Sequence, residues 1–190
     1  RLARWQFSMA FLMTGAVSVA LGGWRGITLW QFEMLALSSL FGVVLASTTY
    51  FITIAAIGPR LTAMLFALTS PFALILGYLA LGETINATES MGVVLVLTGI
   101  VLAIDRRKIG LSAQQAPVPI WGIVTGVITA FGQALGGLFA RPAMETGVEP
   151  FTAMAIRTGL AAVIFLALIV LPAARASRNS IPCDYGILAI

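Results

Sequence analysis

Three apolar runs, each about as long as a membrane-spanning helix, constrain the fold of this chain most. They cover Leu61–Leu81, Ile120–Ala140 and Phe151–Leu171. A helix needs roughly 20 apolar residues to cross the hydrocarbon core of a bilayer. The 190-residue chain is 59% hydrophobic and only 9% charged, whereas soluble domains carry about 25% charged residues. The sequence therefore predicts an all-α, polytopic membrane protein.

Turn and linker residues divide the chain into about six complete transmembrane helices and the start of a seventh. Pro59 in the tight turn Gly58–Arg60 suits the first position of a helix. Arg141 and Pro142 are expected to end the fifth span. Asp105–Pro119 is expected to be a solvated, non-helical linker. The expected spans are residues 2–21, 30–57, 61–81, 89–104, 120–140 and 150–171, and the seventh begins after residue 184.

The residue types exclude several classes of function. The net charge is +4, but the basic residues lie at the ends of the apolar runs, which favours loops beside anionic lipid over a nucleic-acid site. The chain has no histidine and one cysteine, Cys183, so it holds neither histidine chemistry nor an internal disulfide. Asp105, Asp184 and Lys108 fall in loops, which argues against an intramembrane enzyme. No enzymatic activity, cofactor or metal site is expected.

An ordered set of features distinguishes residues 63–104. An apolar helix carries Thr69-Ser70-Pro71 at mid-span and ends at Leu81-Gly82-Glu83. After a polar turn, a second apolar run contains Gly92 and Gly99. The proline removes one backbone hydrogen bond, and such a break is tolerated in a membrane where it lines a cavity or where neighbours replace the bond. The break favours a transport protein over a passive anchor.

This stretch, with Gly42 in the second span, resembles the EamA domain of the drug/metabolite transporter superfamily. The family's repeat has a proline-bearing helix, a Gly-Glu at its end and a glycine-punctuated final helix. The resemblance implies a ten-helix bundle of two five-helix repeats. Residues 1–104 would then form the first repeat without its first helix, 105–119 the linker and 120–190 the start of the second repeat. Both ends of the chain look cut, and four helices are expected outside it.

The resemblance also implies a function. The leading hypothesis is a secondary transporter that exports a small metabolite, amino acid or drug-like solute by alternating access in a bacterial inner membrane. Its expected partners are that solute and the lipid bilayer, without nucleic acid, and a homodimer is left open. One alternative is a nucleotide-sugar or sugar-phosphate carrier, which needs more basic cavity residues than Arg157 and Arg4 supply. The other alternative is a non-transporting membrane assembly protein.

Polar residues inside the spans are the candidates for a substrate cavity. Arg157 lies about two turns inside its span, where it either faces a cavity or reaches the interface with its long side chain. Gln133 lies in the middle of the fifth span and needs a partner, which is a substrate or a neighbouring helix. The remaining predicted cavity residues are Thr69, Ser70, Pro71, Tyr50 and Tyr78.

Two alternatives stay open for these residues. The hydroxyls of Thr69 and Ser70 can bond back to the helix that Pro71 weakens. Tyr78 can anchor its helix at the membrane interface. Glycines at helical spacing predict close helix packing instead of chemistry, and they are Gly122, Gly126, Gly132, Gly136, Gly92 and Gly99.

Overall fold

The computed structural model describes residues 2–24, 26–84, 86–109 and 119–170, and the regular elements in these ranges are all helices. Four helical stretches are long and apolar enough to cross a membrane: Leu29–Ile57, Pro59–Leu81, Ile120–Glu145 and Pro150–Ala167. Two further apolar helices, Trp5–Ala20 and Ala87–Leu102, are shorter. These lengths are compatible with a polytopic helical membrane protein. Six full spans and a two-repeat layout stay predictions, and the seventh helix lies outside the described residues.

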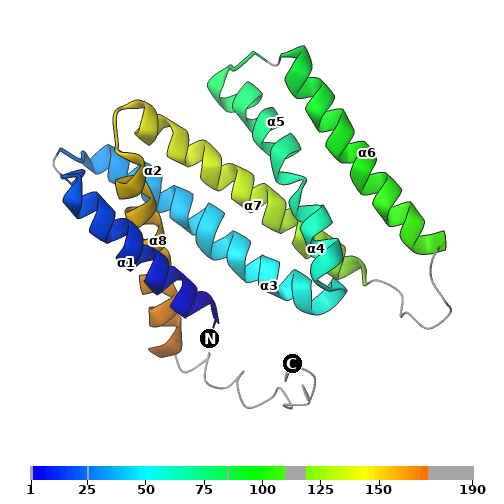
Figure 1. The fold of residues 1–190 in the computed structure, drawn as a ribbon, viewed down its shortest axis with the longest axis horizontal. Helices are drawn as coiled ribbons and strands as arrows, with labels where there is room; N and C mark the ends of the chain where they lie inside the picture. Colours follow the sequence, from blue (N-terminus) through cyan, green and yellow to red (C-terminus); the bar gives the residue numbers. More distant parts are fainter. Residues whose placement is uncertain (1, 25, 85, 110–118, 171–190) are drawn as a thin grey trace.

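The helices form a bundle around α7 (Figure 1). Their bounds are α1 Leu2–Ala20, α2 Leu29–Ser39, η1 Leu40–Leu45 (a π-helix), α3 Ala46–Ile57, α4 Pro59–Phe66, α5 Thr69–Leu81, α6 Ala87–Ile109, α7 Ile120–Glu145 and α8 Pro150–Val170. α2, η1 and α3 follow one another without a break as one long helix. α7 lies between this helix and α5, and α6 lies at the outer edge.

α1 crosses α8 in antiparallel orientation. Ser18 near the end of α1 is hydrogen-bonded to Thr152 near the start of α8. Phe7, early in α1, stacks on Phe165, late in α8, with 5.6 Å between the ring centroids. The first described helix therefore packs against the last one.

Local residue chemistry sets several helix ends. Thr28 caps α2, because its hydroxyl accepts from the Gln31 N–H while its own N–H donates to Gln31 Oε1, which satisfies two otherwise unpaired donors. Gly58 has a φ of 81° directly before Pro59, the first residue of α4. The predicted tight turn at this point is confirmed. Gly82 ends α5 in the left-handed conformation, which glycine adopts without a steric penalty.

Two predicted helix ends are wrong. α6 continues to Ile109, so residues 105–109 are helical instead of linker. Arginine and lysine are good helix formers, so the basic composition of this segment does not oppose a helix. α7 continues through Pro142 to Glu145. The loss of one backbone hydrogen bond at Pro142 is offset by packing, because the next residue, Ala143, is fully buried in a core cluster with Leu35 and Ile156.

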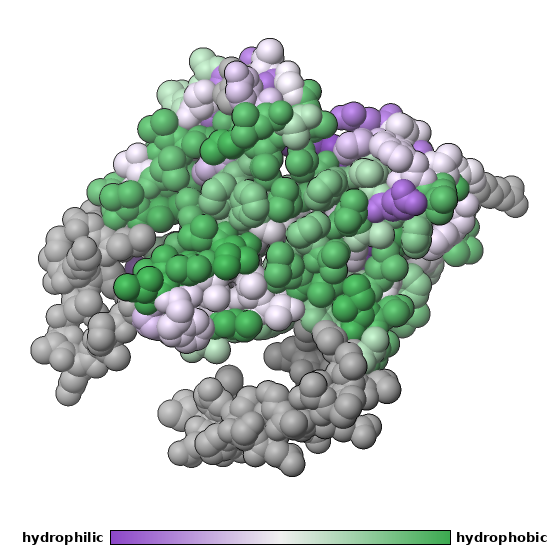
Figure 2. Space-filling view, turned by 180° about the vertical axis from the view of Figure 1, so that it is seen from behind, coloured by the Kyte–Doolittle hydropathy of each residue, from purple (hydrophilic) through white to green (hydrophobic). Residues whose placement is uncertain are grey.

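Small side chains fill the helix interfaces, while large apolar side chains point outward. Ala130, Ala134 and Ala155 are buried, whereas Met13 and Leu79 are exposed. Helices in lipid associate mainly through close packing of small residues, because lipid tails are as apolar as the side chains. Figure 2 shows hydrophobic residues over most of one face and hydrophilic residues mainly in its upper part. This distribution suits a surface in contact with lipid.

Two helices approach each other backbone to backbone at Gly42 and Gly136. A Cβ on Gly42 would lie 2.8 Å from the Gly136 Cα, and a Cβ on Gly136 would overlap the Gly42 backbone. A Cβ on Gly122 would meet the side chain of Ile57, and a Cβ on Gly126 would meet the side chain of Leu65. A Cβ on Gly132 would lie 3.2 Å from the carbonyl oxygen of Phe41. The two glycine pairs of α7 thus face two partners. One is the long helix formed by α2, η1 and α3, and the other is the short helix α4.

Gly92 and Gly99 differ from the glycines of α7. A Cβ on either residue would have no other described atom within 4 Å, outside the helix's own nearby backbone. Both lie in α6, at the outer edge of the bundle (Figure 1). Their packing role stays a prediction.

Glu149 stabilises the start of α8. Its Oε2 accepts hydrogen bonds of 2.8 Å from both the N–H and the hydroxyl of Thr152. Desolvation raises the pKa of this carboxyl, but hydrogen bonds from the Thr152 side chain and from the Thr152 and Phe151 N–H groups outweigh it and hold the pKa below its ordinary value. The carboxylate therefore contributes stability above its ordinary pKa, and the contribution is lost as the pH falls through the lowered value.

A Glu149→Gln variant is expected to unfold at a lower temperature than the parent protein at pH 7. The difference should vanish once the pH falls below the lowered pKa, because both side chains are then uncharged. Thermal unfolding in detergent across a pH series measures this effect. Glu145→Gln, an exposed position at the end of α7, is the control. Equal unfolding temperatures for Glu149→Gln and the parent protein at pH 7 would contradict the capping role.

Candidate substrate cavity

A cavity of about 250 Å³ lies between α1, α3, α4 and α7. α1 and α3 contribute most of its wall, and α4 and α7 contribute one residue each. Gln133 lies near the middle of α7, so the cavity is open at mid-helix depth instead of at a loop. The lining residues are Gln6, Phe7, Ala46, Ser47, Tyr50, Phe51, Phe66 and Gln133.

The polar groups of the cavity are uncharged. They are the carboxamides of Gln6 and Gln133, the hydroxyl of Ser47 and the phenol of Tyr50. Within the described ranges, no hydrogen bond joins these four side chains to another residue. Carboxamides and hydroxyls can both donate and accept. The cavity therefore offers unused hydrogen-bonding capacity to a solute or to water.

Aromatic rings form the rest of the wall. Tyr50 packs edge-to-face against Phe66, with 5.6 Å between centroids, and against Phe51, with 6.2 Å. Phe7 is held by its stack on Phe165. Aromatic pairs in these geometries are attractive beyond simple area burial. The rings are thus held in place by one another, and they present an apolar surface beside the polar groups.

The cavity brings together two of the predicted site residues, Gln133 and Tyr50. The helix break is close by, because α4 ends at Phe66 in the cavity wall and α5 begins at Thr69. The Thr69 hydroxyl donates to the Phe66 carbonyl oxygen over 2.7 Å. This agrees with the alternative in which the hydroxyl bonds back to the helix that Pro71 weakens. Pro71 is buried, and Ser70 is exposed. Thr69, Ser70 and Pro71 are not among the lining residues.

Tyr78 lies away from the cavity. It is 54% exposed on α5 and does not line the cavity. This position agrees with the alternative of an interface anchor.

Arg157 lies just beyond one end of the cavity. Its Nη2 is 3.2 Å from the position that a Cβ on Gly42 would occupy, and Gly42 precedes the lining residue Ala46 by about one turn. The Nε atom is buried without a hydrogen-bond partner in the described part of the chain. Nη1 has only a long contact of 3.9 Å with the Met154 sulfur. The guanidinium is thus close to the cavity and poorly satisfied.

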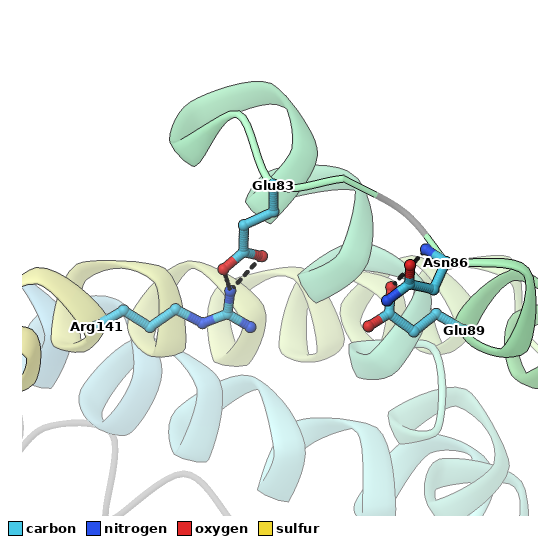
Figure 3. Close-up of polar contacts among 4 residues, drawn as sticks. All are labelled: Glu83, Asn86, Glu89 and Arg141. Atoms are coloured by element: carbon cyan, nitrogen blue, oxygen red, sulfur yellow. Dashed lines mark hydrogen bonds and ion pairs between the residues drawn. The ribbon is translucent and has the colours of Figure 1, made fainter.

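An ion pair joins α5 to α7 at one end of the bundle (Figure 3). Arg141 Nη1 lies 2.7 Å from both carboxylate oxygens of Glu83. Gly77 leaves the space for it, because a Cβ there would overlap Glu83 Oε2. The two side chains are 41% and 48% exposed, so the pair contributes at most about 1 kcal/mol. The sequence gave no sign of this pairing.

Several cavity residues were not expected from the sequence. Ser47 belongs to a polar cluster, Ser47–Tyr50, that carries only a weak signal because hydroxyls can bond inside a membrane helix. Two members of that cluster do so, since the Thr48 hydroxyl donates to the Val44 carbonyl oxygen and the Thr49 hydroxyl donates to the Leu45 carbonyl oxygen. Gln6, Phe7, Phe51 and Phe66 carry no distinguishing local signal, and only the helix arrangement places them together.

Comparison with known families decides the class of this bundle. The sequence model described as the EamA-like transporter family matches residues 1–104, which is more than half of the 190 residues. The chain belongs to the EamA-like transporter family. No curated protein and no solved structure gives a significant match.

Membership of the EamA-like family identifies the protein in general terms as a membrane transporter of the drug/metabolite type. Members of the family are transporters and not enzymes. The matched residues coincide with the range expected for the first repeat. The division of the chain into two repeats stays a prediction.

Proposed function

We propose that this EamA-like protein is a secondary transporter that exports a small solute by alternating access in a bacterial inner membrane. The cavity between α1, α3, α4 and α7 is its substrate site. One observation carries this assignment: an aromatic-walled cavity at mid-helix depth presents four uncharged polar side chains with unused hydrogen-bonding capacity. Small-molecule sites are typically concave, mostly apolar and equipped with a few polar groups. Transporter sites lie near the bilayer midplane.

Two irregular helix segments adjoin the cavity and supply the means for a change of shape. The π-helix η1 ends at Leu45, directly before the lining residue Ala46. The break between α4 and α5 directly follows the lining residue Phe66. π-Segments and broken helices in membrane proteins often accompany functional sites, because their backbone bonds can rearrange. We take α5 as the moving element and the Glu83–Arg141 pair as its contact with α7 in one state.

The lining residues favour this function over a nucleotide-sugar or sugar-phosphate carrier. Such a substrate carries several negative charges, and the eight lining side chains include no basic residue. Among the described side chains, the guanidinium of Arg157 lies beyond the cavity end. The cavity chemistry therefore suits a metabolite or drug-like solute with little net charge.

Substitutions in the cavity test the proposal. Gln133→Leu and Tyr50→Phe are each expected to lower solute flux by about tenfold, because each removes polar contacts of roughly 1–2 kcal/mol. Flux is measured in proteoliposomes that contain the complete protein, with the best-transported member of a panel of amino acids, small metabolites and drug-like compounds. Tyr78→Phe is the matched control, since it removes the same hydroxyl outside the cavity, and it should leave flux unchanged.

Two results would overturn the proposal. Normal flux in both Gln133→Leu and Tyr50→Phe, with folded protein recovered at the parental yield, would exclude this cavity as the transport site. A loss of flux in Tyr78→Phe equal to that in Tyr50→Phe would also contradict it. In that case the effect of the hydroxyl would not depend on the cavity.

A further inference from the structure

Among the described residues, the guanidinium of Arg157 has no counter-charge. Its Nε is shielded from solvent and unpartnered within the part of the chain that the structure describes, and the nearest polar contact is a methionine sulfur. A charged group inside a membrane protein is costly unless it is paired or faces water. The carboxylates whose side-chain surroundings the structure describes belong to residues at or near helix ends, and these are Glu33, Glu83, Glu89, Glu145 and Glu149. An anion from outside these residues would satisfy the guanidinium.

One side of the Arg157 guanidinium lies against a residue without a side chain. That residue is Gly42, where a Cβ would lie 3.2 Å from Arg157 Nη2 and would crowd the guanidinium. Gly42 is buried within the π-helix η1, a type of segment that is rare and frequently placed at functional sites. This glycine therefore keeps side-chain bulk away from the charged group.

The helices that carry Gly42 and Gly136 also reach the cavity. Ala46 follows Gly42 by about one turn, and Gln133 precedes Gly136 by about one turn. Both Ala46 and Gln133 line the cavity. A solute seated between the aromatic rings thus needs to extend by only about one helical turn to bring an acidic group to the guanidinium.

Hydrogen bonds between helices fix this geometry. The Ser39 hydroxyl donates to the carbonyl oxygen of Arg157 over 2.7 Å, which ties α8 to α2. The Ser38 hydroxyl donates to the carbonyl oxygen of Gly136 over 2.5 Å, which ties α7 to α2. The base of the arginine side chain is therefore held in position before any ligand arrives, which lowers the cost of binding.

We propose that Arg157 binds the carboxylate of the transported solute while the apolar body of that solute occupies the aromatic cavity. The substrate class is a small organic acid or zwitterion with one carboxylate on an apolar, ring-bearing body. The planar guanidinium matches a carboxylate in shape and can donate two parallel hydrogen bonds. The cavity of about 250 Å³ limits the body to the size of a small metabolite. This inference rests on the proposed function, because it takes the cavity as the substrate site.

Benzoate and benzamide form a matched pair of probes, since they share a ring and differ in charge. Their affinities are measured by calorimetry on the complete protein in lipid nanodiscs. The parent protein is expected to bind benzoate at least tenfold more tightly than benzamide. Arg157→Gln should lower benzoate affinity at least tenfold and leave benzamide affinity within twofold. Arg157→Lys should keep a preference for benzoate, because it keeps the charge.

Each contrary result has a defined meaning. Equal or tighter binding of benzamide by the parent protein, or no benzoate binding, overturns the carboxylate site, even if the arginine variants do not fold. A preference for benzoate that persists in Arg157→Gln assigns the anion to another residue. If solute flux is lost in Gln133→Leu while benzoate does not bind, the transport cavity stands and only the carboxylate site fails. If neither probe binds and flux is insensitive to Gln133, both proposals fail.

Discussion

Replacing Gly136 by leucine is expected to reduce the yield of folded protein by about tenfold or more, because overpacking a tight interface costs roughly 1–3 kcal/mol or more. The Gly136 Cα faces the Gly42 backbone, and a Cβ there would also lie 2.7 Å from the Gly42 nitrogen. Backbone atoms cannot rotate away as a side chain can. The only relief is separation of α7 from η1, which would also break the hydrogen bond from Ser38 to the Gly136 carbonyl.

The neighbouring residue supplies the matched control. Gly137→Leu introduces the same side chain one position along α7, where a Cβ would meet nothing within 4 Å. Its yield and its elution profile in size-exclusion chromatography should equal those of the parent protein. Comparable losses for the two variants would show that leucine is harmful at this depth for reasons other than the Gly42 contact.

The second large effect is expected at Pro71. Replacing it by alanine should lower solute flux by about tenfold, while the expression level stays within about twofold of the parent protein. Proline has no N–H, so the Ala67 carbonyl cannot receive the regular bond from residue 71 and instead accepts from the Ser70 N–H at 3.3 Å. Alanine would restore that bond and favour one straight helix in place of α4 and α5. Phe66 would then move relative to the rest of the cavity wall.

A circular dichroism spectrum and a flux assay on the same preparation separate the effect of Pro71→Ala on helix structure from its effect on transport. Flux should fall while the helical content is kept or slightly raised. Pro59→Ala is the control, because Pro59 occupies the first position of α4, where its missing N–H has no helical partner to lose. A fully active Pro71→Ala protein would mean that the helix break plays no part in transport.

The sequence predicts the positions of the spans well because hydropathy is a local property. The run Leu61–Leu81, the turn at Gly58 and Pro59, and the start of the sixth span at Pro150 all have counterparts in the structure. Helix ends are less predictable where tertiary packing opposes the local signal. Proline at position 142 suggests an end, but the burial of Ala143 in the next position keeps α7 helical.

Only part of the cavity could be foreseen. Gln133 and Tyr50 stand out because a polar side chain inside an apolar run needs an explanation. Phe7 and Phe66 do not, since an aromatic residue in an apolar run is ordinary, and only the meeting of α1 with α3 and α4 makes them part of a site. The Glu83–Arg141 pair was also out of reach, because its members are 58 positions apart and their meeting depends on how α5 packs on α7.

The crossing of α1 with α8 has a consequence for how the protein is made. The described partner that α1 packs against most is α8, which begins about 130 residues after α1 ends. At synthesis rates of about 5–20 residues per second, α1 would enter the membrane on the order of ten seconds before its partner exists. During that interval Ser18 lacks the Thr152 hydroxyl to which it is bonded in the finished protein. The stretch that carries the family signature ends at residue 104, before α8 begins, so the unit that is recognised in the sequence is smaller than the unit that must assemble.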